Sequence, residues 1–267
     1  MKTSFSKLPV IHYHFKEIDS THTWARENVE KFSKNSWVLI TAGFQSAGKG
    51  TGGRIWWSPA QVNIYATFVF FIPTKFKDCT GYIPQITAVS AAQVLEKKGV
   101  SCQIKWVNDI FLHNKKLGGI LTQTIPMENE GQIAILLSIG LNVNMAEKIC
   151  QLDQPITSLL LETGHTWDEK ELIALIQNRL QHNLALLLEE GFQSFAKELN
   201  AHLAFLKSSV HFENRGRILS GIVEGVNDNG ALRLRLPDGS LRDYIEGRIL
   251  PRPPIAPQEV LESALPS

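Results

Sequence analysis

Residues 37–72 read WVLITAGFQSAGKGTGGRIWWSPAQVNIYATFVFFI. The stretch starts with a short apolar run at residues 37–42, continues through a glycine-rich loop at 43–54, and ends in a second apolar run at 63–72. Runs of this length, rich in branched and aromatic residues, predict β-strands. A strand that leads through a glycine loop into another strand excludes the folds in which a helix must follow such a loop.

The glycine-rich loop also carries two cations, Lys49 and Arg54. Glycines let a backbone approach a ligand closely and turn its N–H groups inward, and both cations suit phosphate or carboxylate. The loop partly matches a phosphate-binding P-loop, but Gly50 stands where that motif needs serine or threonine. The loop therefore predicts an anion site that is not a P-loop, with a flexible surface loop as the alternative.

Strands and helices are expected on both sides of this stretch. Short apolar runs predict further strands, and apolar residues at helical spacing predict helices. The order of these elements predicts an α+β fold with a mixed sheet and flanking helices. The expected strands cover residues 10–15, 103–106, 110–112, 117–124 and 132–144, and the expected helices begin after Ser20 or Thr21, at Pro84, and at a capping box of Thr166 and Glu169.

The spacing changes from about residue 206 onward. Short strands at 210–212, 218–226, 231–236 and 241–245 alternate with tight turns. This arrangement predicts a small antiparallel β-barrel. The expected domains are therefore a large domain over 1–205, which carries the candidate site described below, a barrel over 206–253 and a flexible tail over 254–267.

The composition is that of an ordinary globular protein. Hydrophobic residues make up 43% of the 267 residues, and the formal net charge of +1 provides no overall basic field for nucleic acid. The three cysteines, Cys79, Cys102 and Cys150, are too widely spaced for a zinc site, which favours free thiols in a reducing compartment. No apolar stretch is long enough to span a bilayer. We therefore expect a cytoplasmic protein with no membrane partner.

Three further polar clusters follow predicted strands. Lys105 provides a cation for phosphate, Asp109 is a hard oxygen ligand suited to magnesium, and Asn108 can orient either ligand. Lys116 precedes two glycines, which would let a ligand lie against its strand. Asn142 ends a long apolar run, so its amide needs a partner, either a ligand or a backbone group. Polar turns and ordinary edge-strand residues are the alternative interpretation.

Together the clusters predict a pocket for a polyanion, magnesium and an apolar organic partner. No Ser–His–Asp set, pair of catalytic carboxylates or redox motif competes with them. A reaction that needs only positioning and charge neutralisation fits, such as attack of a carboxylate on the α-phosphate of ATP. This interpretation requires four cations, far apart in the chain, to converge on one pocket: Lys49, Arg54, Lys105 and Lys116.

These residues resemble, in order and spacing, the motifs of the biotin–protein ligase family. Residues 45–59 resemble its biotin-loop signature, 105–109 its Lys-Trp-Pro-Asn-Asp motif, 116–121 and 140–144 two more, and 19–21 its early Ser-Thr element. The likeness covers nearly the whole chain. It implies a sheet similar to that of class II aminoacyl-tRNA synthetases with a small SH3-like barrel, and an enzyme that uses ATP and magnesium to convert biotin to biotinyl-5'-AMP.

The resemblance also implies roles for individual residues. Lys116 would meet the reacting carboxyl group and α-phosphate, and Trp56 would pack on the adenylate. The residues expected to bind biotin are Ser20, Thr21, His22, Gln45, Lys49, Gly50, Thr51, Lys116 and Gly118. Those expected to bind ATP are Lys49, Arg54, Trp56, Lys105, Asn108, Asp109 and Asn142, with Asp109 as the magnesium ligand. The expected catalytic residues are Lys116, Lys49 and Arg54.

The chain departs from the family pattern at five positions. Lys49 stands where the family usually has arginine, Val107 replaces the usual proline, and Arg248 stands where the family often has glutamate. Thr51, followed by Gly52, replaces another arginine of many members. The change at these two positions removes positive charge over the adenylate, so we expect the intermediate to be held less tightly.

The resemblance implies that the acceptor is a biotin carboxyl carrier protein, the acceptor domain of acetyl-CoA carboxylase or a similar enzyme. Some family members bind DNA through an N-terminal helix-turn-helix, but here the catalytic pattern begins by about residue 18, so no DNA binding is expected. The oligomeric state stays open, with a homodimer as one alternative. Two rival functions also stay open: a lipoate or octanoate ligase or transferase of the same superfamily, and a non-catalytic biotin-binding protein.

Overall fold

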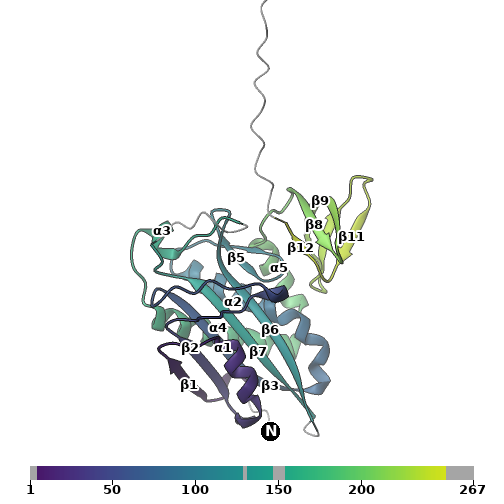
Figure 1. Ribbon diagram of the computed structural model, residues 1–267. Helices are drawn as coiled ribbons and strands as arrows, with labels where there is room; N and C mark the ends of the chain where they lie inside the picture. The colour runs from purple at the N-terminus through teal and green to yellow at the C-terminus, as the bar shows by residue number, and fades with distance from the viewer. Residues whose placement is uncertain (1–4, 129–130, 147–153, 251–267) are drawn as a thin grey trace, which may run out of the picture.

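The large sheet of the protein is seven-stranded and mixed (Figure 1). The computed structural model describes residues 5–128, 131–146 and 154–250. The strand order is β1-β2-β3-β7-β6-β5-β4, with β1 parallel to β2 and the other neighbouring pairs antiparallel. The strands are β1 (Val10–Phe15), β2 (Trp37–Ala42), β3 (Asn63–Pro73), β4 (Gln103–Lys105), β5 (Asp109–Leu112), β6 (Lys115–Met127) and β7 (Gln132–Asn142).

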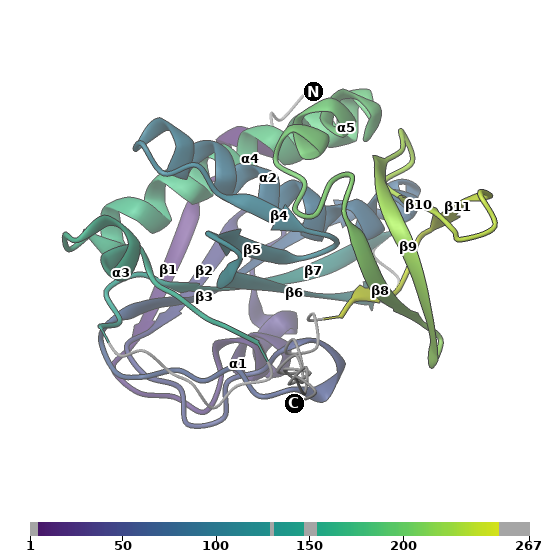
Figure 2. The same cartoon turned by 90° about the horizontal axis from the view of Figure 1, so that it is seen from above.

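Helices lie on both faces of this sheet. Seen from above, α2 and α4 cover one face, and α1 lies with the long loops on the other (Figure 2). None of the helices in the described part of the chain is long and apolar enough to cross a membrane. The α-helices are α1 (Thr21–Asn28), α2 (Ile83–Lys97), α3 (Leu159–Thr163), α4 (Glu169–Glu190) and α5 (Gln193–Ala201), and the 3-10 helices are η1 (Phe5–Lys7), η2 (Val29–Lys31), η3 (Thr51–Gly53) and η4 (Thr74–Tyr82).

Because both faces of the sheet are covered, its central strands are apolar at nearly every position. On β2, Trp37 and Leu39 pack into the core that contains α2 and α4, whereas Val38 and Ile40 pack with α1. This alternation follows from the opposite directions of successive side chains in a strand. The first ten residues of β3 are all buried for the same reason, which explains why the unbroken apolar run correctly predicted a strand.

A second sheet, five-stranded and antiparallel, follows α5 and lies to one side of the large sheet (Figure 1). The buried indole of Trp106, at the end of β4, donates to the carbonyl of Gly230 in this sheet at 3.1 Å. Gln85 on α2 donates to the same carbonyl at 3.1 Å, so one backbone group joins both units. The strands are β8 (Ser209–Asn214), β9 (Arg217–Val226), β10 (Leu232–Arg235), β11 (Leu241–Tyr244) and β12 (Arg248–Ile249), in the order β11-β10-β9-β8-β12.

The predicted α+β organisation is confirmed, but one helix start was predicted wrongly. Helix α4 is capped by Asp168, whose carboxylate accepts from the N–H groups of Lys170 and Glu171 at 2.9 and 3.0 Å. Glu169 does not close the expected capping box, because its carboxylate accepts from the Asn144 amide at 3.0 Å. A carboxylate that accepts two backbone bonds is a strong N-cap, and it displaces the predicted one.

Other expectations concern the thiols and the C-terminus. Cys79 and Cys102 are free thiols, as expected, and burial raises the pKa of Cys102 to about 12. Cys150 lies outside the described residues. The expected tail at 254–267 also lies outside them.

Candidate functional site

A cavity of about 420 Å³ opens between the glycine-rich loop and the sheet. Its walls include residues from α1, from β3 to β7, from the segment before α3, and from the end of the second sheet. All four cations that were required to converge line this cavity: Lys49, Arg54, Lys105 and Lys116. The structure therefore brings together positive charges that are separated by up to 67 positions in the sequence (116 − 49 = 67).

Most of the other predicted site residues also line the cavity, but Gly118 does not. A side chain at Gly118 would point toward Leu141 and Ile110 on the core side, whereas one at Gly119 would meet Trp56 and Lys116. The two faces of β6 alternate, so Gly118, a predicted biotin contact, lies on the face turned away from the cavity, and Gly119 lines the cavity instead. The predicted residues that do line it, besides the four cations, are Ser20, Thr21, His22, Gln45, Gly50, Thr51, Trp56, Asn108, Asp109 and Asn142.

The glycine-rich loop folds back on itself rather than entering a helix. Lys49 and Ile55 form an antiparallel bridge, and the N–H of Gly50 donates to the carbonyl of Arg54 at 2.8 Å. Gly52 and Gly53 form the tip with φ of +64° and +76°, a left-handed conformation that favours glycine. This local hairpin holds Lys49 and Arg54 at the mouth of the cavity.

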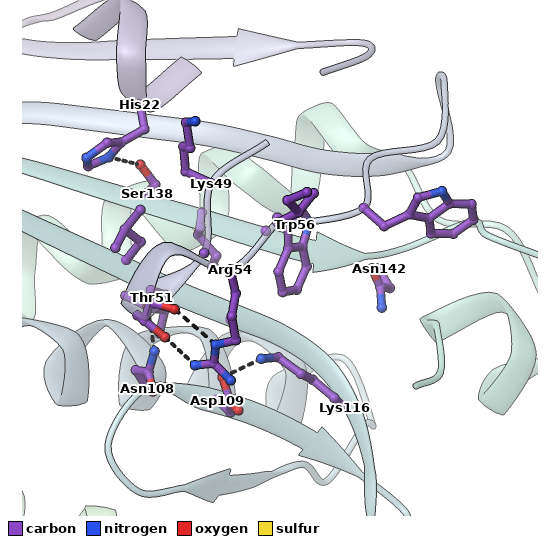
Figure 3. A pocket seen from close by; sticks show the side chains of 18 of the residues that line it. His22, Lys49, Thr51, Arg54, Trp56, Asn108, Asp109, Lys116, Ser138 and Asn142 are labelled. Atoms are coloured by element: carbon purple, nitrogen blue, oxygen red, sulfur yellow. Dashed lines mark hydrogen bonds and ion pairs between the residues drawn. The ribbon is translucent and has the colours of Figure 1, made fainter. Parts of the chain in front are cut away.

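Arg54 is positioned by the loop that contains it. Its Nε donates to the carbonyl of Thr51 at 2.9 Å, and its terminal nitrogen donates to the Thr51 hydroxyl at 2.5 Å. Figure 3 shows the guanidinium of Arg54 reaching from Thr51 toward Asp109. Thr51 therefore has a role of its own, because its carbonyl and hydroxyl groups orient the guanidinium of Arg54.

Lys116 forms an ion pair with Asp109 inside the cavity. The two charged atoms, Nζ and Oδ1, are 2.7 Å apart, and only 12% and 13% of the two side chains is exposed. The ammonium also lies 5.4 Å from the centre of the Trp56 ring (Figure 3). A cation held between a carboxylate and an aromatic face is fixed before any ligand arrives, as positioning and electrostatic stabilisation require.

Lys105 is the most deeply buried of the four cations, with 7% exposed. Burial is the main cause that lowers its pKa to about 8. The carboxylate of Asp109 opposes this shift, and the nearby positive charges of Lys116, Arg54 and Arg248 add to it. Lysines crowded in this way favour an anion between them, because an anion relieves their repulsion.

Trp56 lies on two glycines of the sheet. A Cβ atom added to Gly140 on β7 would lie 2.4 Å from the Trp56 ring, and one added to Gly119 on β6 would lie 3.0 Å from it. No larger residue fits at Gly140 without displacing the indole. The Trp56 Nε1 atom is buried without a hydrogen-bond partner among the described residues, so the ring is held by its close fit to the strands.

A chain of hydrogen-bonded polar side chains lies at the other end of the cavity. The N–H and the hydroxyl of Thr21 donate to Gln45 Oε1 at 2.9 and 3.1 Å, and Gln45 Nε2 donates to the Ser58 hydroxyl at 3.0 Å. All three side chains are buried. Because each of these three side chains has a hydrogen-bond partner away from solvent, the network holds them in fixed orientations.

The series of hydrogen-bonded side chains continues from Thr21 to His22, the next residue of α1, by way of Thr67 and Ser138. The Thr67 hydroxyl lies 2.9 Å from the Thr21 hydroxyl and 2.8 Å from that of Ser138, which in turn lies 2.8 Å from His22 Nδ1. His22 Nε2 is 3.0 Å from Gln123 Oε1, and burial lowers the pKa of His22. Thr67 and Ser138 are partners in the β3–β7 register, which places their hydroxyls on one face.

Three predicted ligand-binding residues have backbone partners. The Ser20 hydroxyl caps α1 by accepting from the N–H of Thr23 at 3.4 Å. The Asn108 amide donates to the carbonyl of Ile120 at 2.7 Å, and the Asn142 amide donates to that of Thr157 at 2.9 Å. Of the two alternatives for the Asn142 amide, a ligand or a backbone group, the structure therefore supplies the backbone group.

Asp109 is the candidate magnesium ligand. The described residues contain no group of three or more His, Cys, Asp or Glu side chains that could hold a metal by themselves. A single carboxylate fits magnesium when phosphate oxygens complete the coordination, because magnesium is usually bound by one or two carboxylates together with phosphates and water. The donor set thus suits a metal that arrives with a nucleotide.

Several residues that line the cavity were not predicted. Arg248, noted only as a departure from the family pattern, reaches it from β12, where it pairs with Glu213 at 2.7 Å. Gln154 and Ile156 reach it from the segment before α3, and Ser138 from the middle of β7. These positions were missed because none of them belongs to the motifs at 45–59, 105–109, 116–121 and 140–144 on which the site prediction rested.

Comparisons with known proteins identify a family for the sequence. The model of the biotin/lipoate A/B protein ligase family matches residues 14–144, and that of the biotin protein ligase C-terminal domain matches residues 207–250. The biotin–[acetyl-CoA-carboxylase] ligase of Paracoccus denitrificans is 30% identical over 230 residues, which cover 83% of this chain and 92% of that protein. The bifunctional ligase/repressor BirA of Escherichia coli (strain K12) is 26% identical over 237 residues, 87% of this chain and 71% of that protein.

A solved structure shows the same fold. The biotin protein ligase from Aquifex aeolicus in complex with biotin and ATP superimposes with a TM-score of 0.75 at 24% identity. The match covers 90% of this chain and 97% of that one. Both sheets therefore belong to an arrangement already known in that protein.

Proposed function

The chain belongs to the biotin–protein ligase family, and from this premise we propose how its pocket works and which protein receives the product. It is an ATP-dependent ligase that activates biotin as biotinyl-5'-AMP and transfers the biotinyl group to a carrier protein. The observation that carries the assignment of the pocket is the meeting of four cations and Asp109 in one cavity.

The first step joins two anions. A carboxylate oxygen of biotin attacks the α-phosphorus of ATP, the bond to the bridging oxygen breaks, and pyrophosphate leaves. Lys116, fixed between Asp109 and Trp56, is placed to neutralise the charge where the carboxylate meets the α-phosphate. Lys49 and Arg54 at the mouth, with Lys105 deeper in the cavity, offset the charge of the other phosphates.

The two ends of the cavity differ in character, and we assign one ligand group to each. The hydrogen-bonded chain around Thr21 and Gln45 suits a neutral polar group such as the ureido ring of biotin, because it places uncharged hydroxyl and amide groups at that end of the cavity. The end with Lys105 and Asp109 suits the phosphates. Magnesium, when bound at Asp109 together with phosphate oxygens, would neutralise charge on the leaving pyrophosphate.

The second step transfers the biotinyl group. The amine of the acceptor lysine attacks the acyl carbon of biotinyl-5'-AMP, AMP leaves, and the amine loses a proton as the amide forms. The proposed acceptor is a biotin carboxyl carrier protein of acetyl-CoA carboxylase or a similar enzyme, in line with the name of the Paracoccus relative. For this step the protein needs mainly to hold the adenylate in position and to keep water away from it.

Purified protein, ATP, magnesium and a carrier domain test this function directly. Biotin should give pyrophosphate release and a labelled carrier lysine, whereas lipoate and octanoate should give neither. Pyrophosphate release with lipoate instead would favour the rival acyl specificity. Binding of biotin with no pyrophosphate release would favour the rival binding protein.

The division of the chain is part of the proposal. We assign ligand binding and catalysis mainly to residues 1–205, and we place a smaller SH3-like unit at 206–253. The large mixed sheet with helices on both faces is compatible with a class II synthetase-like core. The match of the C-terminal family model to residues 207–250 supports this division.

The lowered pKa of Lys105 makes ATP binding sensitive to pH. Below about pH 8 Lys105 is charged and ready for a phosphate; above it, binding must take up a proton, so the KM for ATP should rise by up to about tenfold per pH unit. Lys105→Arg keeps its charge throughout this range and should give a flat profile between pH 8 and 9.5. Equal slopes in both proteins would show that another group titrates.

Thr51 and Gly52 should shorten the life of the enzyme-bound intermediate. The loop tip carries no cation at these positions, and the Thr51 side chain is committed to Arg54. Thr51→Arg removes the hydroxyl contact to Arg54 but keeps the contact of Arg54 Nε with the carbonyl of residue 51, and it should lengthen the half-life of bound biotinyl-5'-AMP several-fold, because the new charge-assisted contact to the phosphate outweighs the lost one. The half-life is measured by trapping released adenylate after a single turnover. A half-life unchanged by the added arginine contradicts this explanation.

A further inference from the structure

The segment 154–157 lies beside Lys116, although it is distant in the chain. The N–H of Lys116 donates to the carbonyl of Pro155 at 2.9 Å, and the N–H of Thr157 donates to the carbonyl of Lys116 at 2.9 Å. Lys116 and Ile156 thus form a parallel bridge, and both line the cavity. The backbone of Lys116 is therefore held by a segment outside its own hairpin.

Segment 154–157 pairs with β6 at Lys116, where the pairing of β6 with β7 has ended. The described pairing of β6 with β7 begins at Gly118 and Leu141, two residues beyond Lys116. The amide of Asn142, at the end of β7, donates to the carbonyl of Thr157 at 2.9 Å and so joins β7 to segment 154–157. The place of Lys116 thus depends on how firmly segment 154–157 is fixed.

Glu162 on α3 joins both sides of this bridge. Its Oε1 accepts from the Thr157 hydroxyl at 2.5 Å and from the Lys115 ammonium at 2.8 Å, and its Oε2 accepts from His113 Nδ1 at 2.6 Å. Thr157 and Lys115 are the immediate chain neighbours of the two bridged residues. Because neighbouring side chains of a strand point to opposite faces, a Lys115 directed at Glu162 leaves Lys116 directed at the cavity.

The carboxylate of Glu162 is stabilised in its charged form by its three donors. Only 11% of its side chain is exposed. Burial by itself would raise its pKa, but the hydrogen bonds from Lys115, Thr157 and His113 outweigh that effect and lower the pKa to about 2. A carboxylate that accepts from three donors links α3, the β5–β6 turn and segment 154–157.

We propose that Glu162 is a positioning residue for Lys116, one that holds both partners of the Lys116–Ile156 bridge and so sets where the ammonium lies in the cavity. Glu162 does not line the cavity and acts only through the residues that do. The inference rests on the proposed function, in which Lys116 contacts the adenylate.

A double-mutant cycle tests this link. The four proteins are wild type, Glu162→Gln, Lys116→Met and the double variant, and the readout is the Kd for a non-hydrolysable biotinyl-adenylate analogue. Glu162→Gln keeps the shape of the side chain but removes its charge, and it should weaken binding about tenfold because Lys116 shifts. In the Lys116→Met background the same change should alter the Kd by less than about twofold, because coupled residues are not additive.

Two further variants separate positioning from general stability. Lys115→Met removes the other charge of the link and should weaken binding in the same direction, again only when Lys116 is present. Glu171→Gln removes the charge of an exposed glutamate that pairs with Lys98 at 2.6 Å, and should leave the Kd unchanged. Melting temperatures of all variants are measured in parallel, so that lost folding is recognised.

The outcomes are distinct. An unchanged Kd in Glu162→Gln, or an equal loss in both backgrounds, overturns the positioning role. A wild-type protein that neither binds the analogue nor releases pyrophosphate with biotin overturns the proposed function instead. Binding by wild type, with a loss that disappears in the Lys116→Met background, supports both.

Discussion

Lys116→Met should lower the rate of biotin adenylation by roughly 100- to 1,000-fold, the cost of removing one preorganised charge from a transition state. Methionine keeps most of the apolar stem but not the ammonium, which lies 2.7 Å from Asp109 and faces the cavity. The rate is measured as pyrophosphate release in a single turnover. Because the polar end around Thr21 and Gln45 is unchanged, the affinity for biotin without ATP should change far less.

Lys98→Met is the matched control. Lys98 is a partly exposed lysine that pairs with Glu171 at 2.6 Å and does not line the cavity. Its replacement removes the same charge from the protein and should leave adenylation unaffected. If Lys116→Met retained more than about a third of the wild-type rate, the charge at the reacting centre would have to come from another residue, and the assignment of Lys116 would be wrong.

Gly140→Ala should raise the KM for ATP about tenfold or more. The new Cβ would lie 2.4 Å from the Trp56 ring, so the indole must leave its place on β7. Loss of a stacking surface for the adenine costs on the order of 1–3 kcal/mol when aromatic contacts to a base are removed. Steady-state kinetics with varied ATP measure the change, and Trp56→Ala should raise the KM in the same direction without altering the strand.

Gly81→Ala serves as the control for a glycine replacement. An added Cβ at Gly81, in η4, meets no atom within 4 Å, so the change should affect neither the KM nor the melting temperature. A wild-type KM in Gly140→Ala, with normal folding, would mean that the Trp56 ring can shift without cost. The proposed packing of Trp56 on the adenylate would then have to be abandoned.

The large sheet could be predicted because its strands are buried on both faces. Mainly apolar runs such as residues 63–72 are typical of strands buried on both faces, and glycine-rich or polar turns separate them. The short helices α3 and α5 were missed, since five or nine residues carry too little periodicity to be recognised. The start of α4 was predicted wrongly because both Thr166 and Asp168 are suitable N-cap residues, and the structure shows that Asp168 is the N-cap.

The cationic part of the site was predictable for a different reason. Lys49, Arg54 and Lys116 stand in short segments that combine a cation with glycines, and glycines let the backbone approach a ligand closely. Ser138 and Arg248 also lie close to glycines, at Gly140 and Gly247, but their place in the cavity depends on strand register and on the packing of the second sheet. Contacts set by tertiary packing leave no local trace in a single sequence.

Lys105 and Trp106 are consecutive residues that serve different parts of the molecule. Lys105 lines the cavity, while the Trp106 indole donates to Gly230 of the second sheet. Residues 247–250 of that sheet line the same cavity. Occupancy of the cavity and docking of the second sheet are therefore thermodynamically linked: a ligand that prefers the docked form stabilises it by mass action, and loosening of the second sheet weakens retention of the ligand to the same degree.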